Sequence, residues 1–216
     1  IPWLVWSVPV LGALLTPLFA KIGNKFRNFM AVLFSFTAAI FASFLLPTAI
    51  QSETIHSQVS WIPVLGINAG VLADPLSIFM ANIVAWISFL IMVYSIGYMH
   101  GEKNLTRYWF FMNLFIGNML LIVMSDNFLQ LFFGWEGVGL CSYGLIGFWN
   151  RDELKTYVGT PGHKAWGLAK AYSPSQAGMK AFMMTRIGDV SFLIGLLILY
   201  FYAGTFDFIE LGEITG

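Results

Sequence analysis

Long apolar runs separated by short polar segments predict six membrane-spanning helices in this chain. A run of about 20 apolar residues crosses a bilayer of about 30 Å as a helix. The runs cover residues 2–20, 29–50, 76–98, 108–124, 127–149 and 178–203. Residues 51–75 break the pattern with alternation around 59–62 and with Gly and Pro, which predicts a short β-hairpin at the membrane face. The expected fold is an all-α integral membrane bundle with one hairpin.

Local signals place several of the boundaries. Asp74 followed by Pro75 is typical of a helix N-cap with proline in the first turn. Residues 125–127 are the whole connection between the fourth and fifth runs, so these two helices should be antiparallel neighbours. The acidic end, 205–216, resembles a loop, and because the chain begins at Ile1 we expect it to be a piece of a longer protein.

Residues 150–176 are the one sizeable polar segment, for which we expect a surface loop. Trp166, Leu168 and Lys170 favour a short interfacial turn within it. The string GTPGHK at 159–164 shares residues with a phosphate-binding loop. It lacks the Ser or Thr after the lysine and a preceding strand, so that interpretation fails.

Composition agrees with a membrane protein and removes several classes of function. Hydrophobic residues make up 58% of the chain and charged residues 10%, with a mean hydropathy of +0.75. Soluble proteins average about 45–50% and 25%. The zero net charge argues against nucleic acid as a partner. Cys141 is the single cysteine, so it forms no intrachain disulfide and supplies no local iron–sulfur ligand set.

The distribution of basic residues predicts the orientation of the helices. If the connections alternate between the two sides, ten of the 11 Lys and Arg lie on one side, which should be the cytoplasm or its equivalent. Both ends of the chain then lie on the opposite side. The ten are Lys21, Lys25, Arg27, Lys103, Arg107, Arg151, Lys155, Lys164, Lys170 and Lys180.

Glu136 is the most informative residue, because it lies near the middle of an otherwise apolar helix. Its depth is about 14 Å, where a carboxylate costs about 2.5–3.5 kcal/mol on insertion scales. Gly139, Tyr143 and Gly147 share its face of the helix. Next to that face lies a seam of small residues, namely Gly134, Gly137, Cys141 and Gly144. Both faces should therefore be buried, and an ion pathway is the leading hypothesis. The alternative is a neutral, hydrogen-bonded glutamate that joins two helices.

Three charged residues of the last run accompany Glu136. Arg186 and Asp189 are three residues apart, so they are neighbours on one helix face and can pair. Together with Glu136 they provide two acids beside a base, which is what a proton relay requires. Their alternative role is a structural ion pair. Lys180 lies nearer the basic surface, either as an interfacial anchor or at a proton entrance.

No cofactor or metal site is expected within the chain. His56, His100 and His163 fall in or beside loops, where we expect surface histidines and no clustered metal ligands. The tryptophans are typical of packing and interface belts, not of haem or quinone sites.

Four strings carry a resemblance to a known family. They are GWEGVGLCSYGLIGFW at 134–149, MKAFMMTRIGDV at 179–190, ADPLSIFM at 73–80 and YWFFMNLF at 108–115. Together they resemble the antiporter-like L subunit of respiratory complex I (the chain 5 type of NADH:quinone oxidoreductase). A related archaeal, deazaflavin-dependent dehydrogenase is the other possibility, because the segment at 150–176 is longer than the family's usual link.

The resemblance implies how the chain is organised. Residues 1–105 would hold three helices with an outside hairpin at 51–75. Residues 106–216 would begin a proton-translocating five-helix repeat, one of two in inverted orientation, with an inside loop at 150–176. Glu136 matches the family's proton-loading acid, Arg186 and Asp189 match its TRxGD motif, and Lys180 matches the lysine of MKAF. The lysine that partners the glutamate in the family would lie beyond residue 216.

The resemblance also implies the setting in which the chain works. It would be a non-redox, proton-pumping membrane subunit of an oxidoreductase in a bacterial or archaeal cell membrane. Flavin, iron–sulfur clusters and quinone would belong to partner subunits, and NADH or a reduced deazaflavin would donate electrons. Its own partners would be other membrane subunits, lipid and protons. Two alternatives stay open: a subunit of a multisubunit sodium/proton antiporter, and a structural membrane anchor.

Overall fold

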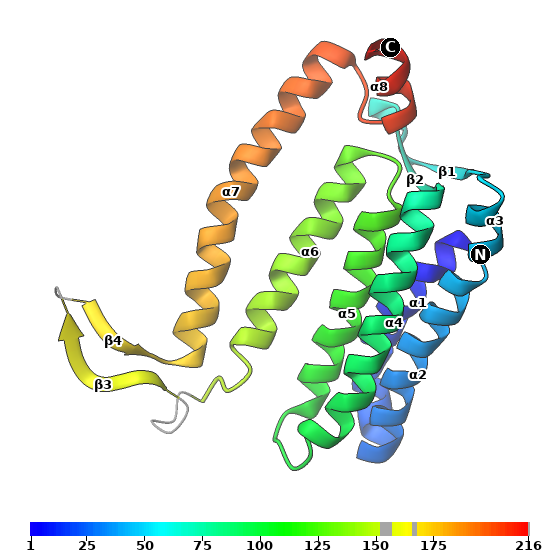
Figure 1. The fold of residues 1–216 in the computed structure, drawn as a ribbon. Coiled ribbons are helices and arrows are strands. Elements are labelled where there is room, and N and C mark those ends of the chain that lie inside the picture. The colour runs from blue at the N-terminus through cyan, green and yellow to red at the C-terminus, as the bar shows by residue number, and fades with distance from the viewer. Residues whose placement is uncertain (152–156, 166–167, 216) are drawn as a thin grey trace.

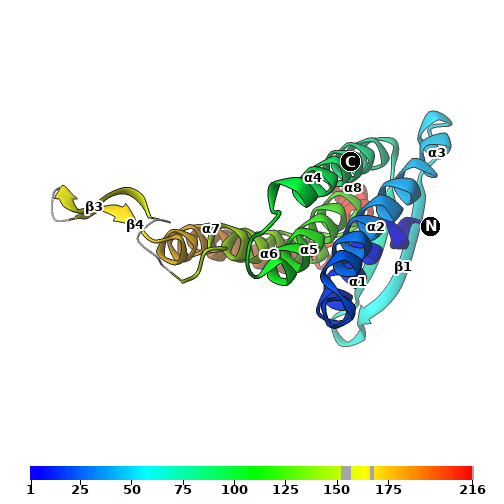
Figure 2. The same ribbon diagram turned by 90° about the horizontal axis from the view of Figure 1, so that it is seen from below.

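A computed structural model describes residues 1–151, 157–165 and 168–215. Four long helices form a bundle, and two more continue from it in a row (Figures 1 and 2). The bundle consists of α1 (Pro2–Ile22), α2 (Asn24–Ser43), α4 (Pro75–Tyr98) and α5 (Leu105–Met124). Next to α5 lies α6 (Phe128–Ile146), and α7 (Pro174–Ala203) lies outermost beside α6.

The bundle is held by small and apolar side chains where its helices meet. Gly117 of α5 lies against Val10 and the backbone of Trp6 in α1, so a larger residue would push these two helices apart. Trp109 is the largest fully buried side chain of this core. Other members of the core are Val5, Ala31, Ala38, Ala39, Ala42, Ile78, Ala81, Ala85, Met92, Ile116 and Leu120.

Within the described residues, five helical segments are long and apolar enough to span a membrane: α1, residues 24–50, α4, α5 and α7. The 19-residue α6 does not reach the same hydropathy, since Gln130, Glu136 and glycines interrupt it. It lies alongside α5 and α7, two of the candidate spans, as a sixth helix of the row (Figure 1). The predicted bundle of six helices is therefore approximately confirmed.

The predicted hairpin is confirmed. Strands β1 (Ile55–Ile62) and β2 (Ile67–Ala73) pair antiparallel, with Ile55 opposite Ala73. The 3-10 turn η1 (Pro63–Leu65) joins them and ends at Gly66, whose φ of 67° suits a residue without a Cβ. The predicted cap of α4 is also present, because the Ser77 amide donates to Asp74 Oδ1 at 2.7 Å.

The polar segment at 150–176 does not follow the prediction of a surface loop with an interfacial turn. Strands β3 (Val158–Ala165) and β4 (Leu168–Tyr172) form a second antiparallel hairpin, which extends beyond α7 at the opposite end of the bundle from β1 and β2 (Figure 1). Leu168 and Lys170 belong to β4, while Trp166 lies outside the described residues. Two hairpins thus supplement the helical fold.

Two further boundaries differ from the prediction. The second span begins at Asn24 and not at residue 29, and α2 ends at Ser43 before the short α3 (Leu46–Ile50). Pro47 explains the break, because it has no N–H to donate to the carbonyl of Ser43 and its ring would clash with that carbonyl in a continuous helix. The acidic end is also helical: α8 (Phe208–Thr215) starts where the Ile209 amide donates to Asp207 Oδ1 at 2.8 Å.

Backbone hydrogen bonds tie α6 to the end of α7 at the side of the molecule where the β1–β2 hairpin lies, which is called the hairpin end. The Phe128 amide donates to the carbonyl of Phe206 at 3.1 Å, and the Phe208 amide donates to the carbonyl of Asp126 at 2.9 Å. The segment that follows α7 is therefore bonded on both sides of Asp207 to the turn that precedes α6.

Candidate functional site

The sequence of α6 fixes which side of the helix faces α5. Asn127 caps the helix, its Oδ1 accepting from the Gln130 amide at 2.7 Å. Gly134, Gly137 and Gly144 face α5, where an added Cβ would meet Ile122, Asn118 and Phe111 in turn. The predicted small-residue seam is thus the α5–α6 interface.

The neighbouring face of α6, which carries Glu136, points toward α7. The rings of Tyr143 and Phe182 lie 5.5 Å apart between the two helices. At the basic end the backbones approach closely, since a Cβ on Gly178 would lie 3.1 Å from the Tyr143 carbonyl oxygen and 3.2 Å from the Gly147 nitrogen. Glu136 is consequently held between two helices and not against lipid alone.

Three of the four predicted site residues meet at this interface. Arg186 Nη1 forms an ion pair with Glu136 Oε2, and it lies 3.7 Å from Asp189 Oδ2 on its own helix. The guanidinium also lies over the ring of Phe182, 4.3 Å from its centroid, as in a cation–π contact. The side chains of Glu136 and Asp189 are 20% and 10% exposed. One base therefore serves two largely buried acids.

This arrangement carries one more acid than base. With all three groups ionised the cluster has a net charge of −1, which is unfavourable in a medium of low dielectric constant. A proton taken up by either carboxylate removes that charge, and Arg186 can then pair with the other carboxylate. Because the acids share one base, a change of charge at either carboxylate alters the charge that the other faces. The geometry suits the storage and exchange of one proton.

Lys180, the fourth predicted residue, lies on the first turns of α7 and is exposed. Arg186 lies six positions further along the chain, which corresponds to about 9 Å along the helix axis. It lies between the basic end of the bundle and the cluster. This position agrees with either of its predicted roles, an interfacial anchor or a proton entrance.

Trp135 belongs to the cluster, although the tryptophans were expected only in packing and in interface belts. Its indole Nε1–H donates to Asp189 Oδ1 at 3.0 Å, while its ring is half exposed. A neutral donor to a carboxylate holds Asp189 in place without adding charge. The available signal was chemical: an indole N–H within a membrane helix needs an acceptor, and Asp189 lies on the next helix.

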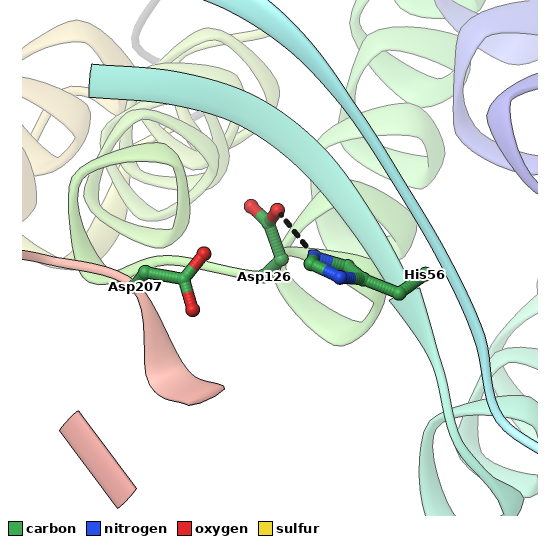
Figure 3. A group of neighbouring side chains, drawn as sticks. All are labelled: His56, Asp126 and Asp207. Atoms are coloured by element: carbon green, nitrogen blue, oxygen red, sulfur yellow. Dashed lines mark hydrogen bonds and ion pairs between the residues drawn. The ribbon is translucent and has the colours of Figure 1, made fainter. Parts of the chain in front are cut away.

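A second cluster of polar residues lies at the hairpin end, where the sequence predicted only an isolated surface histidine. The ligand atoms of His56, Asp126 and Asp207 lie within 4.8 Å of one another (Figure 3). His56 Nε2 is 3.1 Å from Asp126 Oδ2, and Asp126 is fully buried. The expectation that no metal-ligating residues gather is therefore wrong for these three.

The hydrogen bonds of this cluster nevertheless indicate a structural link between chain segments, the clasp, and not a metal centre. Gln58 Nε2 donates to Asp126 Oδ2 at 2.8 Å and to Asp207 Oδ2 at 2.5 Å. The amide group therefore lies between the carboxylates, where a shared cation would have to bind. The cluster joins the β1–β2 hairpin, the turn before α6 and the start of α8.

Gly70→Ala is expected to destabilise this clasp. An added Cβ would overlap the carboxylate of Asp126, which is fully buried and cannot move away freely. Overpacking of this kind costs about 1–3 kcal/mol. Thermal unfolding of the purified protein should show the loss, whereas Gly97→Ala, which meets no atom within 4 Å, should be neutral or stabilising. Equal melting temperatures for Gly70→Ala and the parent would contradict the packing described.

Comparison with known families gives two matches. The family described as "NADH-Ubiquinone oxidoreductase (complex I), chain 5 N-terminus" matches residues 61–109. The family described as "NADH:quinone oxidoreductase/Mrp antiporter, TM" matches residues 125–160 and 167–216. The second match contains all four predicted site residues.

Curated relatives extend the similarity over most of the chain. The NADH-quinone oxidoreductase subunit L of Rickettsia bellii is 36% identical over 200 residues, which is 90% of this chain and 28% of the relative. Subunit L of Escherichia coli K12 is 40% identical over 169 residues, covering 76% of this chain and 24% of the relative. The chain thus spans less than a third of the length of these relatives.

Two solved structures share the fold. The archaeal membrane-bound sulfane sulfur reductase matches with a TM-score of 0.77 and 17% identity, over 95% of this chain and 38% of that one. The Mrp complex of Dietzia sp. DQ12-45-1b matches with a TM-score of 0.73 and 23% identity, over 95% of this chain and 20% of that one.

Proposed function

Because this chain belongs to the family of antiporter-like membrane subunits to which the complex I L subunits belong, we propose that it translocates protons. It is a multi-pass membrane protein whose relatives include subunits of bacterial NADH-quinone oxidoreductases. In this proposal it moves protons without redox chemistry of its own, in a cell membrane and within a larger assembly.

The observation that carries the proposal is the cluster of Glu136, Arg186 and Asp189 between α6 and α7. A mid-membrane ion pair with one surplus acid costs free energy, and proteins retain such groups where ions move. Glu136 would load the proton, and Arg186 would shift between Glu136 and Asp189 as the proton arrives and leaves. Lys180 would deliver protons from the basic side.

Electron transfer in partner subunits would drive this movement. Those subunits would hold flavin, iron–sulfur clusters and the quinone site, with NADH or a reduced deazaflavin as donor. Isolation of the protein from its native membrane tests the assignment. Co-purification with flavin and iron–sulfur subunits is the expected result, and isolation as a single monodisperse chain would contradict it.

A second candidate is a cation/proton antiporter subunit, favoured by the family match whose description includes Mrp antiporters. Vesicles that contain the purified assembly distinguish the two. A sodium gradient alone should drive proton movement in an antiporter, whereas the proposed pump requires the electron donor.

Trp135→Phe is expected to slow proton movement by about fivefold without loss of protein. The change removes the donor to Asp189 Oδ1, and a hydrogen bond of this kind contributes about 1 kcal/mol. Trp149→Phe is the matched control, since it removes an indole that donates to exposed Glu102 at 3.2 Å. Initial rates of acidification of the vesicle lumen measure both variants, and equal rates would remove Trp135 from the site.

A further inference from the structure

A cavity of about 900 Å³ opens at the basic end of the bundle, between the α1–α2 turn and the α4–α5 loop. Its volume lies within the range of ligand sites in proteins, about 300–1,000 Å³. Its charged lining consists of Lys25, Arg27, Lys103 and Arg151 together with Glu102. Among the described residues, four cations thus face one carboxylate.

Arg27 is the most informative member of this lining, because it is only 4% exposed. Its guanidinium donates to Asn24 Oδ1 at 3.1 Å, to Asn28 Oδ1 at 2.8 and 3.1 Å, and to Thr106 Oγ1 at 3.0 Å. These acceptors are neutral, and no carboxylate in the described part of the chain pairs with the guanidinium. A buried cation without a counter-charge is unfavourable, so an anion in the cavity would stabilise it.

Uncompensated donors surround the same cavity. Helices α2 and α5 both begin there, and neither has a side-chain hydrogen bond at its N-cap. Their free amide groups and helix dipoles favour negative charge. Trp109 also lines the cavity. The unsatisfied helix ends and the buried charge of Arg27 are independent features, and both favour an anion in the cavity.

We propose that this cavity binds a phosphate group, either the headgroup of an anionic phospholipid or a free phosphate compound. Four of the five N–H donors of Arg27 are already bonded to neutral acceptors, so its charge, together with the charges of the lysines, would attract a phosphate. The cavity lies at the helix ends on the predicted basic side, where headgroups of the membrane are located. The site lies apart from Glu136, so the proposal stands or falls independently of proton translocation.

The test compares ligand-induced stabilisation of the purified protein in neutral detergent. Phosphatidylglycerol, phosphatidylcholine and inorganic phosphate are added separately, and thermal unfolding is followed by tryptophan fluorescence. Stabilisation by phosphatidylglycerol but not by the other two identifies a lipid headgroup, and stabilisation by inorganic phosphate as well identifies a free phosphate source. Stabilisation by none of them, or equal stabilisation by phosphatidylcholine, would overturn the proposal.

Variants then locate the effect. Lys25→Gln/Lys103→Gln should weaken apparent binding by about fivefold per removed cation, or about 25-fold in total. Lys21→Gln removes an exposed cation of the same surface that does not line the cavity, and it should leave binding nearly unchanged. Lys103→Arg should restore most of the affinity lost in Lys103→Gln. An equal loss in Lys21→Gln would show general charge attraction and overturn the site. Native mass spectrometry of each variant reports retained phospholipid directly.

Discussion

Glu136→Gln is expected to lower coupled proton movement by about 100-fold or more, the scale on which proton-transferring side chains act. Glutamine keeps the shape of glutamate and can still accept a hydrogen bond from Arg186. It cannot ionise, so no proton is loaded. Assembly should survive, because the replacement relieves the surplus negative charge and leaves no cation without a partner: Asp189 stays beside Arg186.

Acidification of vesicles during electron transfer measures this effect, with Glu53→Gln as a control on the exposed surface near the hairpin. Infrared difference spectra of protein isotope-labelled at glutamate should also show a carboxyl band that changes during turnover and is missing in Glu136→Gln. A variant that pumps at the parental ratio of protons to electrons would leave Glu136 only its structural role as a polar contact between helices.

Arg186→Ala is expected to damage folding and assembly more than any change at Glu136. The substitution leaves Glu136 and Asp189 side by side without their base. Removal of one partner from a fully buried pair costs about 3–5 kcal/mol. The loss should be smaller here, because the Arg186 side chain is 31% exposed and water can screen the carboxylates.

The yield of assembled protein in the membrane, measured by native gel, reports the loss. Arg186→Lys keeps the charge and should recover much of the yield, although a single ammonium group cannot reproduce the contact with both acids and the Phe182 ring. Normal yield of Arg186→Ala would show that the two carboxylates are protonated or hydrated in the resting protein.

The sequence alone was sufficient to predict the features that depend on the geometry of a single helix. The 3.6-residue period placed Gly134, Gly137 and Gly144 on one face of α6, and the structure packs that face on α5. The same reasoning paired Arg186 with Asp189. Asp74 before Pro75 likewise located the start of α4. These features depend on local geometry and residue chemistry, which a single sequence contains.

Reasoning from local periodicity could not predict contacts between segments that are distant in the sequence. His56 and Asp126 are 70 residues apart, and Gln58 and Asp207 are 149 apart, so no local period relates them. Trp135 was expected only in packing or in an interface belt, and only the position of α7 shows its acceptor. The β3–β4 hairpin arises in polar sequence, where hydrophobic periodicity is weak, and the helix at 208–215 has only eight residues, too few to be recognised from periodicity.

The connections between α6 and α7 restrict how the cluster can work. Backbone bonds at Phe128 and Phe208 fix the two helices at the hairpin end, and the close approach of Gly147 and Gly178 fixes them at the basic end. Glu136 and Arg186 lie between these two contacts, so sliding of the helices past one another would break the backbone bonds at Phe128 and Phe208. In the proposed mechanism, exchange of partners within the cluster would therefore come from rotation about side-chain bonds. Exposed side chains rotate in picoseconds to nanoseconds, whereas rotation within this largely buried cluster is slower, because an Arg186 ion pair must break first. In the proposed mechanism, the exchange would therefore be controlled by the breaking of these ion pairs and not by movement of α6 against α7.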